Sequence, residues 1–160
     1  MTWRSSTPAC WWSGTGEVMI IPDVNLLVYA YNSDAPDHPK ARAWWEGALS
    51  DRGQVGLPWV VLLGFLRIMT SRRILVAPLT MAEAAVHVRS WLEQPHASII
   101  IPGPLHLDLV EELALRSSAT GELTTDLHLA ALAIEHQAEL HSNDADFSRF
   151  PGLRWKNPLR

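Results

Sequence analysis

Short apolar runs alternate with longer segments of helical periodicity along this chain, and that alternation restricts the possible folds more than any other feature. The run Val18–Pro22 has no polar side chain, as expected for a strand buried on both faces of a parallel sheet. Three more short segments are interpreted as strands: Ser98–Ile101, Ala138–His141 and Leu153–Trp155. Strands that alternate with helices are typical of an α/β domain with a mainly parallel sheet.

The segments between these strands carry the spacing and the end signals of helices. Thr80 and Glu83 have the spacing of a capping box, and Pro58 suits the first turn of the helix that follows it. The sequence predicts helices over Val24–Asn32, Lys40–Leu49, Trp59–Thr70, Thr80–Glu93, Leu105–Arg116 and Thr125–His136.

A length of 160 residues suits one domain, which we expect to cover residues 19–160. Residues 1–18 show neither helical nor strand periodicity and are interpreted as an N-terminal extension outside the fold. Met19 stands where the first strand-like run begins, so translation from Met19 rather than Met1 would account for that extension.

Several classes of protein are excluded by composition. The single cysteine, Cys10, rules out an internal disulfide framework and zinc sites built from several thiolates. The longest apolar stretch, Leu57–Leu66, is too short to span a membrane, which takes about 18 residues or more. With no signal-like run at the start, the expected location is the cytoplasm, with no membrane partner. A net charge of −4 leaves no broad basic surface for nucleic acid, so an RNA or DNA partner would need a local site.

Four aspartates stand where predicted strands end or a helix begins. Asp23 follows the first strand, Asp126 lies in the first turn of the 125–136 helix, and Asp144 and Asp146 follow the 138–141 strand. Each alone is compatible with an ordinary role, either at a helix N-terminus or in a turn. In parallel sheets, however, ligands bind beyond the carboxyl ends of the strands, so we expect the four carboxylates to share one site.

Carboxylates that share one site need a cation. Their mutual repulsion costs on the order of a few kcal/mol per pair at an effective dielectric constant near 20. Oxygen donors without cysteine or histidine favour Mg²⁺ or Mn²⁺. Such an ion activates a water molecule against phosphate esters, so the expected reaction is phosphodiester hydrolysis.

Polar neighbours could support this site. Asn25, Thr125 and Ser142 are placed to orient a carboxylate or a metal-bound water, although capping and turn formation explain the two hydroxyls equally well. Basic residues at the end of the 59–70 helix are compatible with a favourable helix C-terminus or with phosphate binding to RNA: Arg67, Arg72 and Arg73. The seven histidines are interpreted as surface or core residues.

Four segments together resemble the PIN domain, and more narrowly the VapC toxins of type II toxin–antitoxin systems in the subgroup abundant in mycobacteria. These segments are IIPDVNLL around Asp23, TTDLHLAALA around Asp126, SNDADF around Asp144, and FPGLRWKNP near the C-terminus. The resemblance covers residues 19–160 in the right order.

The resemblance implies a PIN-like α/β/α sandwich and an Mg²⁺- or Mn²⁺-dependent endoribonuclease that cuts structured RNA, such as tRNA or rRNA. It implies a cognate VapB-type antitoxin and a toxin homodimer. Asp23, Asp126 and Asp144 would be metal-site acids, with Asp146 as a further acid.

One position departs from the family pattern. The family usually carries a glutamate on the third helix, three residues before an arginine, and this chain has Gly64 before Arg67. Glu112 is a speculative substitute. The alternative hypothesis is therefore a PIN-like module that binds RNA or an antitoxin with weakened catalysis. A phosphatase with Asp23 as its nucleophile is a third hypothesis, disfavoured because Asn25 replaces the second aspartate of that pattern.

Trp44 and Trp45 stand side by side on the predicted 40–49 helix. Core or interface packing is the default interpretation of such residues. An exposed pair would instead form an apolar groove for an antitoxin helix.

Overall fold

The computed structural model of the chain describes residues 18–51 and 53–160. Within these residues, five strands form one parallel sheet in the order β3-β2-β1-β4-β5. The strands are β1 (Ile20–Pro22), β2 (Val55–Pro58), β3 (Ala97–Ile100), β4 (Glu139–His141) and β5 (Trp155–Lys156). Apart from Val18, the expected N-terminal extension lies outside the described residues.

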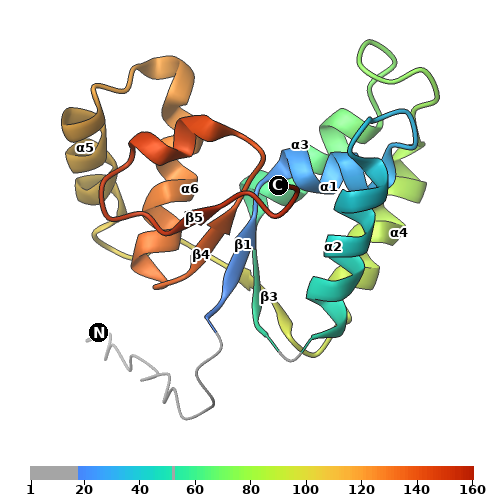
Figure 1. Cartoon of the computed structure of the whole chain (residues 1–160), viewed down its shortest axis with the longest axis horizontal. Helices are drawn as coiled ribbons and strands as arrows, with labels where there is room; N and C mark the ends of the chain where they lie inside the picture. The colour runs from blue at the N-terminus through green and yellow to red at the C-terminus, as the bar shows by residue number, and fades with distance from the viewer. Residues whose placement is uncertain (1–17, 52) are drawn as a thin grey trace, which may run out of the picture.

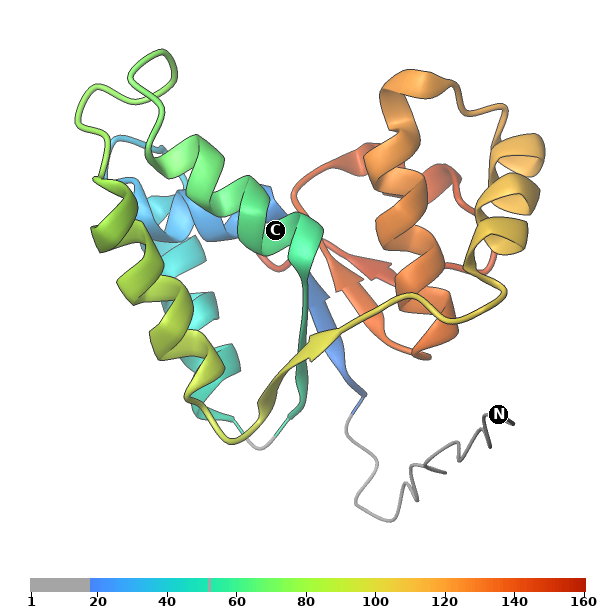
Figure 2. The same cartoon turned by 180° about the vertical axis from the view of Figure 1, so that it is seen from behind.

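Helices cover both faces of the sheet, which makes three layers (Figures 1 and 2). One layer contains α1 (Val24–Tyr31), α2 (His38–Ser50), α3 (Trp59–Met69) and α4 (Met81–Leu92). The other contains α5 (His106–Ser117) and α6 (Thr124–Glu135), with short 3₁₀ turns η1 (Gly121–Leu123) and η2 (Ala145–Arg149). The expected α/β/α architecture with a parallel sheet is therefore confirmed. No helix in the described part of the chain is long and apolar enough to cross a membrane.

The strand order reverses between β1 and β4, and this reversal places the site. From β1 the chain continues to β2 and β3 on one side, and it returns to β4 and β5 on the other. Pro22 is paired with His141 in the β1–β4 register, and the Asp23 amide donates to the His141 carbonyl over 2.8 Å. The residues that follow these two strands therefore begin side by side, at the kind of switch point where α/β proteins bind ligands.

Aromatic side chains form the centre of the helical layer that α1–α4 build. Trp45 is 1% exposed and meets Trp91 edge-on, with ring centroids 5.4 Å apart. Phe65 packs on Trp91 in the same way at 4.7 Å, and the Trp91 indole donates to the Tyr31 hydroxyl over 2.8 Å. The hypothesis of an exposed tryptophan pair on α2 is wrong for Trp45, which belongs to this core.

One strand is missing from the sequence prediction, and the bounds of the other four differ by one or two residues. β2 was not predicted at all, because Val55–Pro58 runs directly into the apolar helix α3 and the sequence shows no boundary between them. β5 lies at Trp155–Lys156 rather than at Leu153–Trp155, because its position is set by pairing with β4, where Leu140 is opposite Trp155. Both differences come from sheet pairing, which local patterns do not contain.

Candidate active site

Asp23 is the most buried of the four aspartates, with 7% of its surface exposed. It caps α1: its Oδ1 accepts from the Val24 amide at 2.6 Å. Its Oδ2 accepts from the Ser142 hydroxyl at 2.7 Å and from the side-chain amide of Asn25 at 2.8 Å. Burial raises the pKa of Asp23 above its usual 3.8, and the Asp144 carboxylate raises it further, against the lowering effect of these hydrogen bonds.

Ser142 joins the segment after β1 to the segment after β4. The fully buried Ser142 hydroxyl donates to Asp23 and accepts from the Asn25 side chain at 3.0 Å. It also accepts from the Asp144 backbone amide at 2.9 Å. One donor and two acceptor positions are thus all used, so Ser142 fixes Asp23 relative to Asp144. Asn25 and Ser142 thus both donate to the Asp23 carboxylate, which is the kind of contact expected of residues that orient it.

The loop after β4 carries the next two acids on an exposed 3₁₀ turn. Asp144 caps η2 by accepting the Asp146 backbone amide at 2.8 Å. Asp146 accepts from the Arg149 guanidinium at 3.1 Å, and both of these side chains are well exposed. Arg149 is thus a cation in direct contact with one of the acids, a contact that the sequence did not predict. The spacing of three residues between Asp146 and Arg149 is the sequence signal that could have indicated this contact.

Asp126 completes the group from the first turn of α6. Its pKa is raised from 3.8 to about 6, mainly by burial and further by the negative charges of Asp23, Asp144 and Asp146. Arg149 opposes this increase. The four predicted acids therefore lie within electrostatic reach of one another, although more than a hundred residues separate the first from the last.

The chemistry of this donor set fits a divalent cation. The donors are carboxylate oxygens, and their mutual repulsion is strong enough to raise the pKa of Asp126. In residues 18–51 and 53–160, however, no three acidic, histidine or cysteine side chains converge closely enough to form a ready-made metal site. The assignment of Asp23, Asp126 and Asp144 as ligands therefore stays a prediction.

The remaining candidate residues lie elsewhere or face solvent. Thr125 is exposed, and the hydroxyl that ties down this turn is that of Thr124, which donates to the Gly121 carbonyl at 2.7 Å. Glu112 pairs with Arg116 on the exposed surface of α5, at 3.0 Å, which gives no support to Glu112 as a substitute acid. Exposed basic side chains occur at the end of α3 and in the turn after it: Arg67, Arg72 and Arg73.

Gly64 lies against the beginning of α1, next to the acidic site. A Cβ atom at Gly64 would lie 3.2 Å from a methyl group of Val24, the residue after Asp23. The position at which the family pattern expects a glutamate therefore does border the acids. The glycine allows α1 and α3 to approach closely there.

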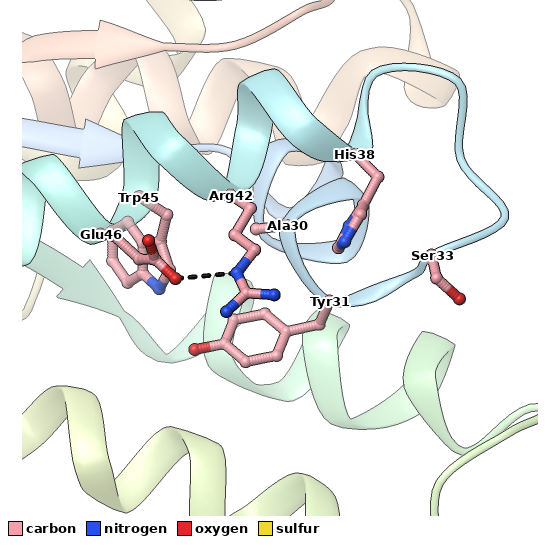
Figure 3. A pocket seen from close by; sticks show the side chains of 7 residues that line it. All are labelled: Ala30, Tyr31, Ser33, His38, Arg42, Trp45 and Glu46. Atoms are coloured by element: carbon pink, nitrogen blue, oxygen red, sulfur yellow. Dashed lines mark hydrogen bonds and ion pairs between the residues drawn. The ribbon is translucent and has the colours of Figure 1, made fainter.

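Two hollows in the described part of the chain are lined by residues other than the four acids. A cavity of about 490 Å³ is found at the other end of α1, and Figure 3 shows its lining: Ala30, Tyr31, Ser33, His38, Arg42, Trp45 and Glu46. Arg42 and Glu46, one turn apart on α2, form an ion pair along its wall at 2.8 Å. A second cavity of about 440 Å³ is lined in part by Trp44, whose indole donates to His141 at 3.2 Å. The two tryptophans thus border different hollows.

Known proteins match nearly the whole chain. The family model for the PIN domain matches residues 20–153. Ribonuclease VapC33 of Mycobacterium tuberculosis is 48% identical over 142 residues, which are 89% of this chain and 99% of that protein. VapBC2 from Rickettsia felis, solved bound to a DNA fragment from its promoter, has a similar fold, with a TM-score of 0.64 at 19% identity over 87% of this chain and 98% of that one. Mycobacterium tuberculosis VapC20, described as a sarcin–ricin loop cleaving toxin, has a TM-score of 0.61 at 19% identity over 84% of this chain and 98% of that one.

The fold, the acids at the β1–β4 switch point and these matches define the class: the chain belongs to the PIN-domain family. Its identity to the mycobacterial relative places it, within that family, among the VapC ribonucleases of toxin–antitoxin systems. The resemblance drawn from the four sequence segments is confirmed.

Proposed function

We propose that this protein is a Mg²⁺- or Mn²⁺-dependent endoribonuclease toxin that hydrolyses phosphodiester bonds in structured RNA, either tRNA or rRNA. The observation that carries the proposal is the grouping of four carboxylates from three distant segments at the β1–β4 switch point. The described relative that cuts the sarcin–ricin loop acts on such an RNA. We accordingly propose a cytoplasmic location, where a substrate such as tRNA or rRNA is found.

The role proposed for each residue at this site follows from its surroundings. Asp23, Asp126 and Asp144 would hold the cation, which when bound lowers the pKa of an attacking water and stabilises the leaving oxygen. The hydrogen bonds from Ser142 and Asn25 orient Asp23 and oppose the increase in its pKa that burial causes. Arg149 carries its guanidinium beside the acids, where it can bind a phosphate of the RNA backbone while Asp146 holds it in place.

The test is RNA cleavage with matched active-site variants. We expect the purified protein to cut tRNA or rRNA with Mg²⁺ or Mn²⁺ and to stop when EDTA is added. Asp126→Asn should lose at least about 100-fold in rate, because it removes one of the carboxylates proposed to hold the cation that activates water and stabilises the leaving oxygen. Sequencing of RNA ends after expression in cells, with Asp126→Asn as the control, identifies the target. Full cleavage by Asp126→Asn, or cleavage indifferent to EDTA, would contradict the proposal.

A second candidate is a weakened module that binds RNA or an antitoxin, and Gly64 is the observation that favours it. Such a module would bind RNA with the same affinity in the wild type and in Asp126→Asn while cutting neither measurably. The phosphatase hypothesis stays disfavoured, because Asn25 stands where that pattern has its second aspartate. Hydrolysis of p-nitrophenyl phosphate tests it directly.

The partners proposed are a VapB-type antitoxin and a second copy of the chain. The structural neighbour from Rickettsia felis was solved as a toxin–antitoxin pair. The cavity beside Arg42 and the one beside Trp44 are candidate contacts for the antitoxin. Co-expression with the product of a short neighbouring gene, followed by co-purification and light scattering, tests both the pair and the homodimer.

A further inference from the structure

The C-terminal segment, residues 155–160, lies along the loop that carries Asn143 and Asp144. β5 pairs with β4, and the Ser142 amide donates to the Lys156 carbonyl at 3.0 Å. The Trp155 indole donates to the Ser142 carbonyl at 3.2 Å. The backbone of Ser142 is thus held on both sides by this segment, while the Ser142 hydroxyl faces Asp23.

Asn157 extends this contact beyond the strand. Its side-chain amide donates to Oδ1 of Asn143 at 2.8 Å, and its own Oδ1 accepts from the Leu159 amide at 3.0 Å. Leu159 is 6% exposed and belongs to the core, and its carbonyl accepts from Lys40 at 3.3 Å. The side-chain oxygen of Asn157 is therefore fixed by the Leu159 amide, and the side-chain nitrogen of Asn157 holds Asn143.

Asn143 connects Asn157 to the acids through hydrogen bonds. Its backbone amide donates to Oδ1 of Asn25 at 3.4 Å, and Asn25 donates to the Asp23 carboxylate. Asp144 is the next residue along the chain. Three asparagines from three segments thus form one hydrogen-bonded chain: Asn157, Asn143 and Asn25.

We propose that Asn157 is a positioning residue for the acidic site, acting through Asn143 on the loop that orients Asp144 and Asp23. This inference rests on the proposed function, because it assigns a role only if the four acids carry the reaction. Asp144 is exposed and its loop has no neighbouring strand beyond Ser142 in the described residues. The Asn157 side-chain amide therefore holds this loop from the side of β5, in addition to the hydrogen bonds that Asn25 and the Ser142 hydroxyl accept from its backbone.

The experiment compares Asn157→Ala with a matched variant, Asn32→Ala. Asn32 lies at the other end of α1 from Asn25, and its side chain also accepts from a backbone amide, that of Asp34 at 3.2 Å. We expect Asn157→Ala to lower kcat by about 10- to 100-fold with KM within about 2-fold, since small displacements of reacting groups cost rates of this size. Asn32→Ala should leave both constants unchanged.

Two further measurements separate positioning from a general loss of structure. Hydrogen exchange in the metal-free protein should show faster exchange of the Asn143 and Asp144 backbone amides in Asn157→Ala and not in Asn32→Ala. The double variant Asn143→Ala/Asn157→Ala should be no slower than the worse single variant, because both remove one link.

The outcomes distinguish this inference from the proposed function. If Asp126→Asn is inactive and Asn157→Ala keeps the wild-type kcat and the wild-type exchange rates, the role of Asn157 is overturned and the proposed function stands. A loss of kcat in Asn157→Ala that only matches its unfolded fraction also overturns it. If Asp126→Asn retains full activity, the proposed function fails first.

Discussion

Gly64 shows how a single side chain could tune the acidic site. The contact of its Cα with Val24 is so close that a Cβ atom would lie 3.2 Å from a Val24 methyl. Any side chain there requires Val24 to shift by a few tenths of an ångström, which a methyl group at the end of a side chain can do. The position is partly exposed, so a longer side chain can extend towards solvent near Val24, the residue after Asp23.

We expect Gly64→Glu to lower the Mn²⁺ concentration needed for half-maximal cleavage by about 3-fold or more, because an added carboxylate strengthens the attraction of the site for a cation. Gly64→Gln has nearly the same shape without the charge and is the matched control. Metal titrations of both variants under identical salt decide the point. Equal responses of Gly64→Glu and Gly64→Gln would show that the position does not act through charge.

The sequence indicated that the four acids would lie near one another, and it named two of the residues that contact Asp23, Asn25 and Ser142. Asp23 follows a strand whose apolar composition is visible in the sequence, and Ser142 lies directly after β4. Asn157 and Arg149 could not be assigned, because the Asn157–Asn143 hydrogen bond depends on β4–β5 pairing and the position of Arg149 depends on the η2 turn. Those interactions are properties of the folded chain.

Helices α5 and α6 are joined by a chain of three polar side chains. The Glu135 carboxylate accepts from Nδ1 of His106 at 2.6 Å, and Nε2 of His106 faces Nδ1 of His128 at 2.8 Å. With both rings neutral, His106 accepts at Nε2 and His128 donates. Burial lowers the pKa of His128, with a further decrease from His106, which favours this neutral arrangement.

We expect His106→Ala to lower the free energy of unfolding by about 1–3 kcal/mol, because it leaves Glu135 without its partner in a partly buried position. His96→Ala is the matched control, since the hydrogen bond described for His96 uses its backbone carbonyl. Urea denaturation of both variants provides the measurement. A double variant with Glu135→Gln should be less than additive, and full additivity would argue against a coupled chain.

The elements that local sequence patterns specify were predicted well, and those that depend on pairing were not. The Thr80–Glu83 capping box is present at the start of α4, as its spacing indicated. β2 is buried at all four positions, so its sequence lacks the alternation of polar and apolar residues that marks a half-buried strand. Periodicity alone does not separate such a run from the buried helix that follows it.

The stability of the whole molecule should depend on pH through opposing groups. The pKa of Asp126 is raised to about 6, so its contribution to stability increases as the pH falls from 7 through 6 towards its unfolded value of 3.8. The lowered pKa values of His128 and His141 act in the opposite direction, because the unfolded chain binds their protons more tightly below pH 6.5. The pH dependence of wild-type unfolding alone therefore does not isolate the contribution of Asp126.

We expect Asp126→Asn to raise the melting temperature of the metal-free protein at pH 7.5, where it removes repulsion, and to raise it less at pH 5, where Asp126 is already protonated. Thermal unfolding of both proteins at the two pH values gives this difference. Added Mg²⁺ should stabilise the wild type more than Asp126→Asn at pH 7.5. An increase in melting temperature that is the same at both pH values would contradict the raised pKa.

The order of the strands also determines when the acidic site comes into existence. Asp23 is translated well before Ser142 and Asp144, which it contacts or repels in the folded protein, and before Asn157. A growing chain that still lacks β4 cannot bring Asp144 and Asp146 next to Asp23, whatever else of it has folded. The four acids therefore come together only after the segment that carries Asp146 has been made and β4 has paired with β1.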